Sequence, residues 1–169
     1  FYRDKDKKEI DLIIEKDNVK VALLNYTYGT NGRTAPPPMV VNLIDKEVMA
    51  RDIEKARELK TDVIIACMHW GDEYLDTPPK RIKEMADWLL AQGVDHIIGN
   101  HPHVIQPMEI RKDDYTMKKS AVVYSLGNLI SGMYARGRDG GVMVELKMKR
   151  MFDLYFLESL KYGLTWVAR

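Results

Sequence analysis

The sequence lacks several features that would assign it to a protein class. It has one cysteine, Cys67, so an internal disulfide is impossible. Its 26 lysines and arginines are balanced by 25 aspartates and glutamates, which gives no electrostatic sign of a nucleic-acid-binding protein. It contains no run of 18 apolar residues, and its first residues do not form a signal peptide. What is left is a globular domain of 169 residues, long enough to bury a real core.

Two similar units follow each other in the middle of the chain. The apolar run 62–65 and the apolar run 95–98 begin 33 residues apart, and each is preceded by a helix-like segment. Short β-branched runs of this kind are typical of buried parallel strands in an α/β sheet. Ligands of such sheets collect at the carboxyl ends of the strands. We therefore expect an α/β fold with a functional site where these two strands end.

The other predicted elements surround this pair. Asp45 is expected to cap a helix that runs to about Leu59, and Gly93 to end a helix that Pro78 opens. Asp17-Asn18 is expected to form a turn between two strands. Further strands are predicted at 9–16, 19–26, 104–111, 120–126 and 142–148. The apolar tail 151–169 indicates one or two more strands or a docking segment.

Three of the four histidines follow the predicted strand ends. Residues two apart in an extended segment point the same way, so His101 and His103 can face one point, and Pro102 favours an extended conformation at His101. With His69 from the neighbouring strand end, three imidazoles are available to a divalent metal. We therefore predict a metal or anion site. His96 lies inside an apolar run and is interpreted as structural.

The loops at these strand ends supply further candidates. Asp72 and Glu73 are candidate catalytic acids, or hydrogen-bonding partners for a ligating histidine. Trp70 either walls a substrate pocket or caps the sheet. Asn25 and Tyr28, at the end of the strand predicted at 19–26, either line the site or belong to a strand followed by an ordinary turn.

The glycine-rich segment 129–141 carries two arginines. Arg136 and Arg138 either offer cations to an anionic substrate or belong to a solvated flexible loop. Arg136 is kept as a candidate substrate-binding residue.

Three motifs occur in order along the chain: His-Trp-Gly-Asp-Glu-Tyr at 69–74, a Gly-Asn-His-Pro-His segment opening 99–107, and Tyr-Ser-Leu-Gly-Asn at 124–128. Together they resemble the bacterial poly-γ-glutamate capsule-synthesis protein family, over roughly residues 19–148. That family is similar to calcineurin-like metallophosphoesterases, which form a four-layer α/β sandwich with mixed sheets and a two-metal site.

The resemblance implies a ligand set and a boundary. It implies that His69, His101 and His103 bind a divalent metal (Zn, Mn or Fe, and two ions in the full-length protein), and that Asn128 lies near the substrate. The family's amino-terminal motifs (an early Gly-Asp, an Asn-x-Glu and an Asn-Asn-His) have no counterpart here. We therefore expect residues 1–169 to be one domain, the carboxyl-terminal part of a longer protein.

A two-metal site needs at least one bridging carboxylate, which the family draws from those amino-terminal motifs. We therefore expect this chain alone to be inactive or nearly so. The missing strands would leave an apolar sheet face exposed, so we also expect the chain to self-associate.

Two functional interpretations stay open. The intact protein is either a metal-dependent hydrolase acting on a phosphorylated or polymer-linked substrate, or a non-catalytic scaffold for assembly and export of poly-γ-glutamate. The expected partners are a polyanionic polymer and other capsule-synthesis subunits. The expected location is the extracytoplasmic face of the cell envelope, with an anchor outside this chain.

Overall fold

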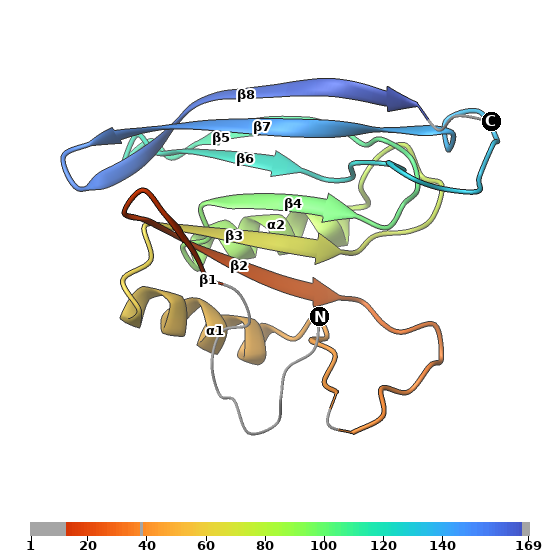
Figure 1. Ribbon diagram of the computed structural model, residues 1–169, viewed down its shortest axis with the longest axis horizontal. Helices are drawn as coiled ribbons and strands as arrows, with labels where there is room; N and C mark the ends of the chain where they lie inside the picture. Colours follow the sequence, from red (N-terminus) through yellow and green to blue (C-terminus); the bar gives the residue numbers. More distant parts are fainter. Residues whose placement is uncertain (1–12, 38, 167–169) are drawn as a thin grey trace.

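The computed structural model describes residues 13–37 and 39–166. These residues form eight strands and two helices (Figure 1). In chain order they are β1 (Ile13–Lys16), β2 (Val19–Thr27), α1 (Lys46–Glu58), β3 (Val63–His69), α2 (Lys80–Ala91), β4 (His96–Asn100), β5 (Met108–Lys112), β6 (Lys119–Val123), β7 (Gly140–Met151) and β8 (Leu154–Trp166).

The main sheet has six strands in the order β1-β2-β3-β4-β6-β5. The four central strands β2, β3, β4 and β6 run parallel, and the two edge strands pair antiparallel with their neighbours. The parallel pairing predicted from the repeated unit is therefore confirmed. Of the strand predicted at 9–16, residues 13–16 form β1, and residues 9–12 lie outside the described residues.

The helices α1 and α2 cover one face of this sheet. Alternate residues of β2 and β3 point toward them, as the period of two in a strand requires. The buried side chains of this layer are Ala22, Leu24, Tyr26, Ile64, Ala66 and Met68 from the strands, and Met49, Ile53, Ala56, Ile82, Ala86 and Leu89 from the helices.

The hairpin of β7 and β8 covers the opposite face (Figure 1). Leu146, Met148 and Tyr155 of the hairpin line a cavity of about 340 Å³ together with Ile65 and His96 of the main sheet. The described residues thus form three layers: helices, mixed sheet and hairpin.

Local sequence signals explain several boundaries. Asp45 caps α1, its side chain accepting hydrogen bonds from the backbone N–H groups of Glu47 and Val48 at 2.9 and 3.0 Å. Gly93 follows α2 with a φ of +93°, which glycine adopts without a steric cost. Asp17 and Asn18 both have positive φ, as a two-residue hairpin turn requires. These three predictions are confirmed.

The apolar tail forms one long strand, β8, paired antiparallel with β7. Near its end Tyr162, Leu164 and Trp166 are 64%, 74% and 76% exposed. This apolar row is consistent with the expected self-association, which stays a prediction. None of the helices in the described residues is long and apolar enough to cross a membrane.

His96 is a buried structural residue at the start of β4. Its Nδ1 accepts a hydrogen bond from the Ala121 N–H at 3.1 Å, and its Nε2 has no hydrogen-bond partner among the described residues. Burial lowers the pKa of His96 to about 4; the nearby Asp95 opposes this shift and Lys118 adds to it.

We expect this buried histidine to make the fold acid-sensitive. Because its pKa in the folded state lies below the ordinary value of about 6.5, its neutral form favours the folded state above that pH. Stability is then lost as the pH falls from about 6.5 to about 4, by roughly 3 kcal/mol.

The matched variant is His96→Asn, whose amide oxygen can accept from Ala121 but does not titrate. Urea unfolding at pH 7.5 and 4.5 should show a smaller loss of stability in the variant. Equal losses in the two proteins would contradict this role of His96.

Candidate metal site

The parallel register brings three strand ends to one edge of the sheet. Thr27 of β2 pairs with His69 of β3, and His69 pairs with Asn100 of β4. The residue after each strand continues this alignment: the Tyr28 N–H donates to the His69 carbonyl at 2.9 Å, and the Trp70 N–H donates to the Asn100 carbonyl at 3.1 Å. His101, directly after β4, is thereby held beside His69.

Four aromatic rings gather at this edge. The ring of Tyr28 lies 5.8 Å from that of His69 and 4.4 Å from that of His101, measured between centroids. The rings of His69 and His101 are 4.6 Å apart, and those of His101 and His103 are 6.2 Å apart. The three histidines predicted to converge are therefore neighbours in the structure.

The backbone of the His-Pro-His segment differs from our expectation. His101 has a φ of +107° and His103 a φ of +61°, so the prediction that this segment is extended is wrong. Strand β4 ends at Asn100, and the chain turns at once. The carbonyl of Pro102 accepts from the Tyr74 N–H at 2.8 Å and so ties this turn to the loop after β3. Positive φ is costly for a non-glycine residue, and such residues cluster at functional sites.

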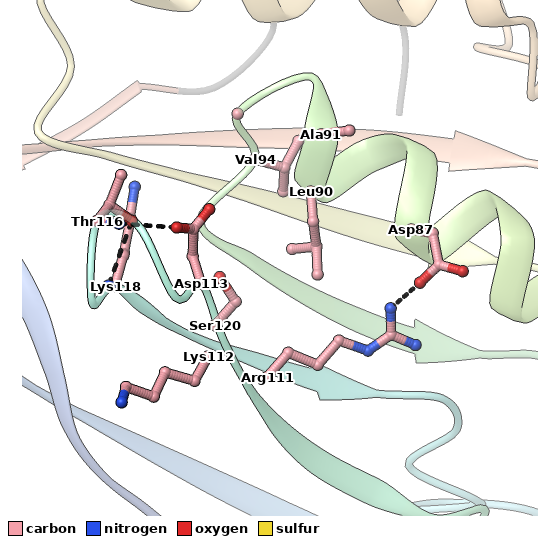
Figure 2. A pocket seen from close by; sticks show the side chains of 11 residues that line it. Asp87, Leu90, Ala91, Val94, Arg111, Lys112, Asp113, Thr116, Lys118 and Ser120 are labelled. Atoms are coloured by element: carbon pink, nitrogen blue, oxygen red, sulfur yellow. Dashed lines mark hydrogen bonds and ion pairs between the residues drawn. The ribbon is translucent and has the colours of Figure 1, made fainter.

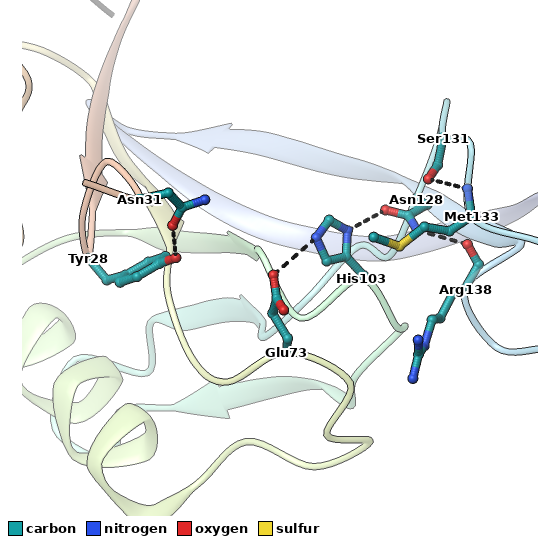
Figure 3. A network of polar contacts seen from close by, with 8 residues as sticks. All are labelled: Tyr28, Asn31, Glu73, His103, Asn128, Ser131, Met133 and Arg138. Carbon is teal, nitrogen blue, oxygen red and sulfur yellow. Dashed lines mark hydrogen bonds and ion pairs between the residues drawn. The ribbon is translucent and has the colours of Figure 1, made fainter. Parts of the chain in front are cut away.

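His103 lies between an amide and a carboxylate (Figure 3). The Asn128 Nδ2 donates to the Arg138 carbonyl at 2.8 Å, which orients the amide so that its Oδ1 faces the His103 Nδ1 at 2.9 Å. An amide oxygen can only accept, so Nδ1 carries a proton, and Nε2 is the ring nitrogen left to bind a metal. This is how a partner fixes the tautomer of a metal-binding histidine. Nε2 lies 3.7 Å from the Glu73 Oε1.

Burial and crowding keep two of the imidazoles neutral. Burial lowers the pKa of His69, and the proximity of His101 and His103 lowers it further. Burial also lowers the pKa of His101, although the Glu73 carboxylate opposes the shift. A neutral imidazole is the form that binds a metal, so both are ready to do so at neutral pH.

The two candidate acids differ in their surroundings. Asp72 makes two hydrogen bonds to Arg81 of α2, at 3.0 and 2.5 Å, and these lower its pKa. Its oxygens are therefore already engaged by a cation. Glu73 faces His103 instead. Their catalytic roles stay predictions.

A hollow of about 640 Å³ opens beside the histidines, lined among others by Tyr28, Ile44, Glu73, Met85 and His101. Trp70 forms part of its wall although the residue is fully buried, and its indole N–H donates to the Tyr124 carbonyl at 3.0 Å. Trp70 therefore both walls the hollow and holds the core beneath it.

Two sequence candidates are not brought into the cluster. Asn25 pairs with Cys67 within the sheet, and no contact in the described residues joins it to a histidine. Arg136 is exposed, and nothing in the described part of the chain connects it to the site. Their companions in the sequence analysis, Tyr28 and Arg138, do lie beside the histidines: Tyr28 contacts His69 and His101, and Arg138 rests on the Tyr74 ring. No local sequence pattern separates Arg138 from Arg136.

The donor types suit a divalent metal: three imidazoles, one oriented by an amide, with a carboxylate beside it. Their present positions do not complete a coordination shell, because no three His, Cys, Asp or Glu side chains in the described residues are arranged to hold an ion. The ligand assignment thus stays a prediction.

A second hollow, of about 400 Å³, lies at the other end of the strands (Figure 2). Two of the cations that line it form ion pairs within the fold: Arg111 pairs with Asp87 and Glu109, and Lys118 pairs with Asp95. This is a network of structural ion pairs.

Comparison with known families assigns the chain. The model of the family described as bacterial capsule synthesis protein PGA_cap matches residues 1–133. The chain belongs to this family. It is 31% identical over 119 residues to the capsule biosynthesis protein CapA of Bacillus anthracis, covering 68% of this chain and 28% of that protein. It is also 31% identical over 107 residues to the PGA biosynthesis protein CapA of Bacillus subtilis strain 168, covering 63% and 26%. The chain thus spans less than a third of these capsule proteins.

Solved structures share the fold. A 5'-nucleotidase precursor from Thermus thermophilus superposes with a TM-score of 0.54 over 92% of this chain and 29% of that one, at 14% identity. The sulfate thiohydrolase SoxB from the same organism gives 0.55 over 92% and 24%, also at 14% identity. At such identities the likeness concerns the fold alone, and it confirms the predicted α/β fold.

We expect Gly99, near the end of β4, to be intolerant of a side chain. A Cβ there would press on the Tyr124 carbonyl oxygen and lie 2.5 Å from the Trp70 Nε1, disrupting the hydrogen bond between them. Gly99→Ala should therefore lower the free energy of unfolding by roughly 1–3 kcal/mol.

Gly163→Ala is the control, because that glycine is also in a strand and an added methyl group would meet nothing within 4 Å. Urea unfolding should leave this variant near wild type. A Gly99→Ala protein as stable as Gly163→Ala would show that the close approach is not required.

Proposed function

We propose that this chain supplies the histidine side of a metal-dependent hydrolase site that acts on a phosphorylated or polymer-linked substrate in capsule biosynthesis. The observation that supports it is the cluster itself. His69 and His101 lie side by side at neighbouring strand ends, and His103 beside them is oriented by Asn128. Structural packing alone does not call for three imidazoles at one sheet edge with a strained backbone between them.

His69, His101 and His103 are the residues that would hold the metal in this proposal, and Zn²⁺, Mn²⁺ or iron accepts such ligands. A bound divalent metal supplies Lewis-acid chemistry to a phosphoryl or carbonyl group. Glu73, beside His103, is the group on this chain able to accept or return a proton. The hollow next to it offers room for the substrate.

The proposal assigns one ion to this chain and leaves a second to the longer family members. Two ions need a bridging carboxylate, and Asp72 is engaged by Arg81. In the intact protein we propose that amino-terminal aspartates complete the site.

The proposed setting follows from the family. Its named relatives are capsule and PGA biosynthesis proteins. We propose poly-γ-glutamate as the polymer, other capsule-synthesis subunits as partners, and the extracytoplasmic face of the cell envelope as the location, with an anchor contributed by another segment.

A non-catalytic scaffold is the second candidate. It is favoured by one observation: no three potential ligands in the described residues are arranged to hold an ion. In that case the histidines contribute packing and hydrogen bonds, and the chain handles or exports polymer.

We expect Zn²⁺ to bind this chain through its histidine cluster. His69→Ala and His103→Ala should each weaken binding by more than about 100-fold, because each removes a ligand. Glu73→Gln should retain the metal, and His96→Asn is the control for a histidine outside the cluster. Titration calorimetry with Zn²⁺ measures this directly, and a wild-type chain that binds no zinc would contradict the ligand assignment.

The two functional candidates predict different outcomes in cells for the intact protein. If it is a hydrolase, a His103→Ala strain with normal protein levels should make no capsule polymer, and Glu73→Gln should reduce turnover by roughly 10²–10⁴-fold. If it is a scaffold, polymer should survive the His103 change while thermal stability falls. Undiminished polymer in that strain would reject the hydrolase.

A further inference from the structure

Arg138 lies close to the histidine cluster through an aromatic contact. Its guanidinium carbon is 3.5 Å from the centre of the Tyr74 ring. Tyr74 in turn stacks on His103, with ring centroids 5.9 Å apart and planes inclined by 26°. The guanidinium and the imidazole are therefore separated by no more than the sum of these two distances.

The backbone holds Arg138 in this place. Its carbonyl accepts from the Asn128 Nδ2 at 2.8 Å, and its N–H donates to the Ala135 carbonyl at 2.9 Å. The Asn128 N–H donates to the Gly140 carbonyl at 2.9 Å, which fixes the other end of the loop. Figure 3 shows Asn128 between His103 and the Arg138 backbone. The same amide thus orients the imidazole and positions the arginine.

The charge of Arg138 is not neutralised by any carboxylate of residues 13–37 or 39–166. Arg81 and Arg111 form ion pairs with acidic side chains, but no carboxylate in the described residues lies within 4.0 Å of the Arg138 guanidinium. A guanidinium that rests one face on an aromatic ring keeps its N–H groups in its own plane, free to meet two oxygens at once. Its half-buried position excludes part of the competing water.

We propose that Arg138 is the oxyanion-binding residue of the histidine site, and that it receives a phosphoryl or carboxylate group of the substrate through two N–H groups. The inference rests on the proposed function in treating the histidines as the reacting end of the same substrate. It distinguishes Arg138 from Arg136, which is exposed and has no contact with the site in the described residues.

The test uses this chain with EDTA present, so that no metal contributes. Inorganic phosphate and, separately, acetate are titrated while the arginine Nε–H signals are followed by NMR. We expect phosphate to shift the Arg138 signal and leave that of Arg136 in place. Arg138→Met should weaken phosphate binding by more than about tenfold, the loss of one bidentate charged contact.

Two further variants sharpen the result. Arg136→Met, the matched control, should bind within about twofold of wild type, since an exposed cation contributes little. Arg138→Lys keeps the charge but loses the paired N–H groups of the guanidinium. Its phosphate affinity should therefore lie between those of the wild type and Arg138→Met. A stronger shift with phosphate identifies a phosphoryl ligand, and an equal or stronger shift with acetate identifies a carboxylate.

The proposal is overturned if neither anion shifts the Arg138 signal of the wild-type chain, a result that depends on no variant folding. Equal loss of binding in Arg136→Met and Arg138→Met would also overturn it. Zinc binding without an anion shift would reject Arg138 alone, whereas an anion shift without zinc binding would reject the metal site alone.

Discussion

The site depends on the parallel register of β2, β3 and β4. Because Thr27, His69 and Asn100 are paired across the sheet, the residues at and just after the strand ends converge on one edge. A shift of one residue in this register would turn the His69 side chain to the helix-covered face. The register is in turn fixed by burial, since the alternate residues of these strands fill the core beneath the two helices.

A second constraint acts where β4 ends. Trp70 and Tyr124 approach across the position of Gly99 so closely that no side chain fits there. The chain must then turn within one residue, and His101 takes up a positive φ. The strained turn is held by the burial of Pro102 and by its bond to the loop after β3. A rigid core thereby imposes the geometry of the His-Pro-His segment.

The sequence was sufficient to predict those features of the fold that depend on interactions between neighbouring residues. Asp45, Gly93 and the Asp17-Asn18 turn all act within a few residues of themselves, and the apolar runs specify strands by their own burial. It also predicted that the three histidines lie together at the strand ends, because that follows from parallel pairing. It gave the wrong conformation at His101, because proline's local preference was overridden by long-range contacts, the burial of Pro102 and its bond to the Tyr74 N–H.

Contacts between residues far apart in the chain could not be predicted from the sequence. The family resemblance placed Asn128 near the site, but its bonds to His103 and to the Arg138 carbonyl join segments with no shared pattern. In the same way, the sequence analysis kept Arg136 as the candidate, whereas the arginine that contacts Tyr74, and through it His103, is Arg138.

The charges around the histidine cluster and Arg138 bear on which ligands the candidate site can bind. Neutral imidazoles would leave the full charge on a bound metal, in contrast to carboxylate ligands, which reduce it. Of the two carboxylates that follow His69, Asp72 is already neutralised by Arg81, so Glu73 alone remains beside the cluster. Arg138, which rests on the Tyr74 ring, adds a positive charge that no carboxylate of the described residues pairs with. In the function we propose, a site so composed would attract anions, and Glu73 is the carboxylate of this loop that Arg81 leaves free. This composition supports our proposals that the substrate is phosphorylated or polyanionic and that further oxygen ligands for a second ion come from another part of the intact protein.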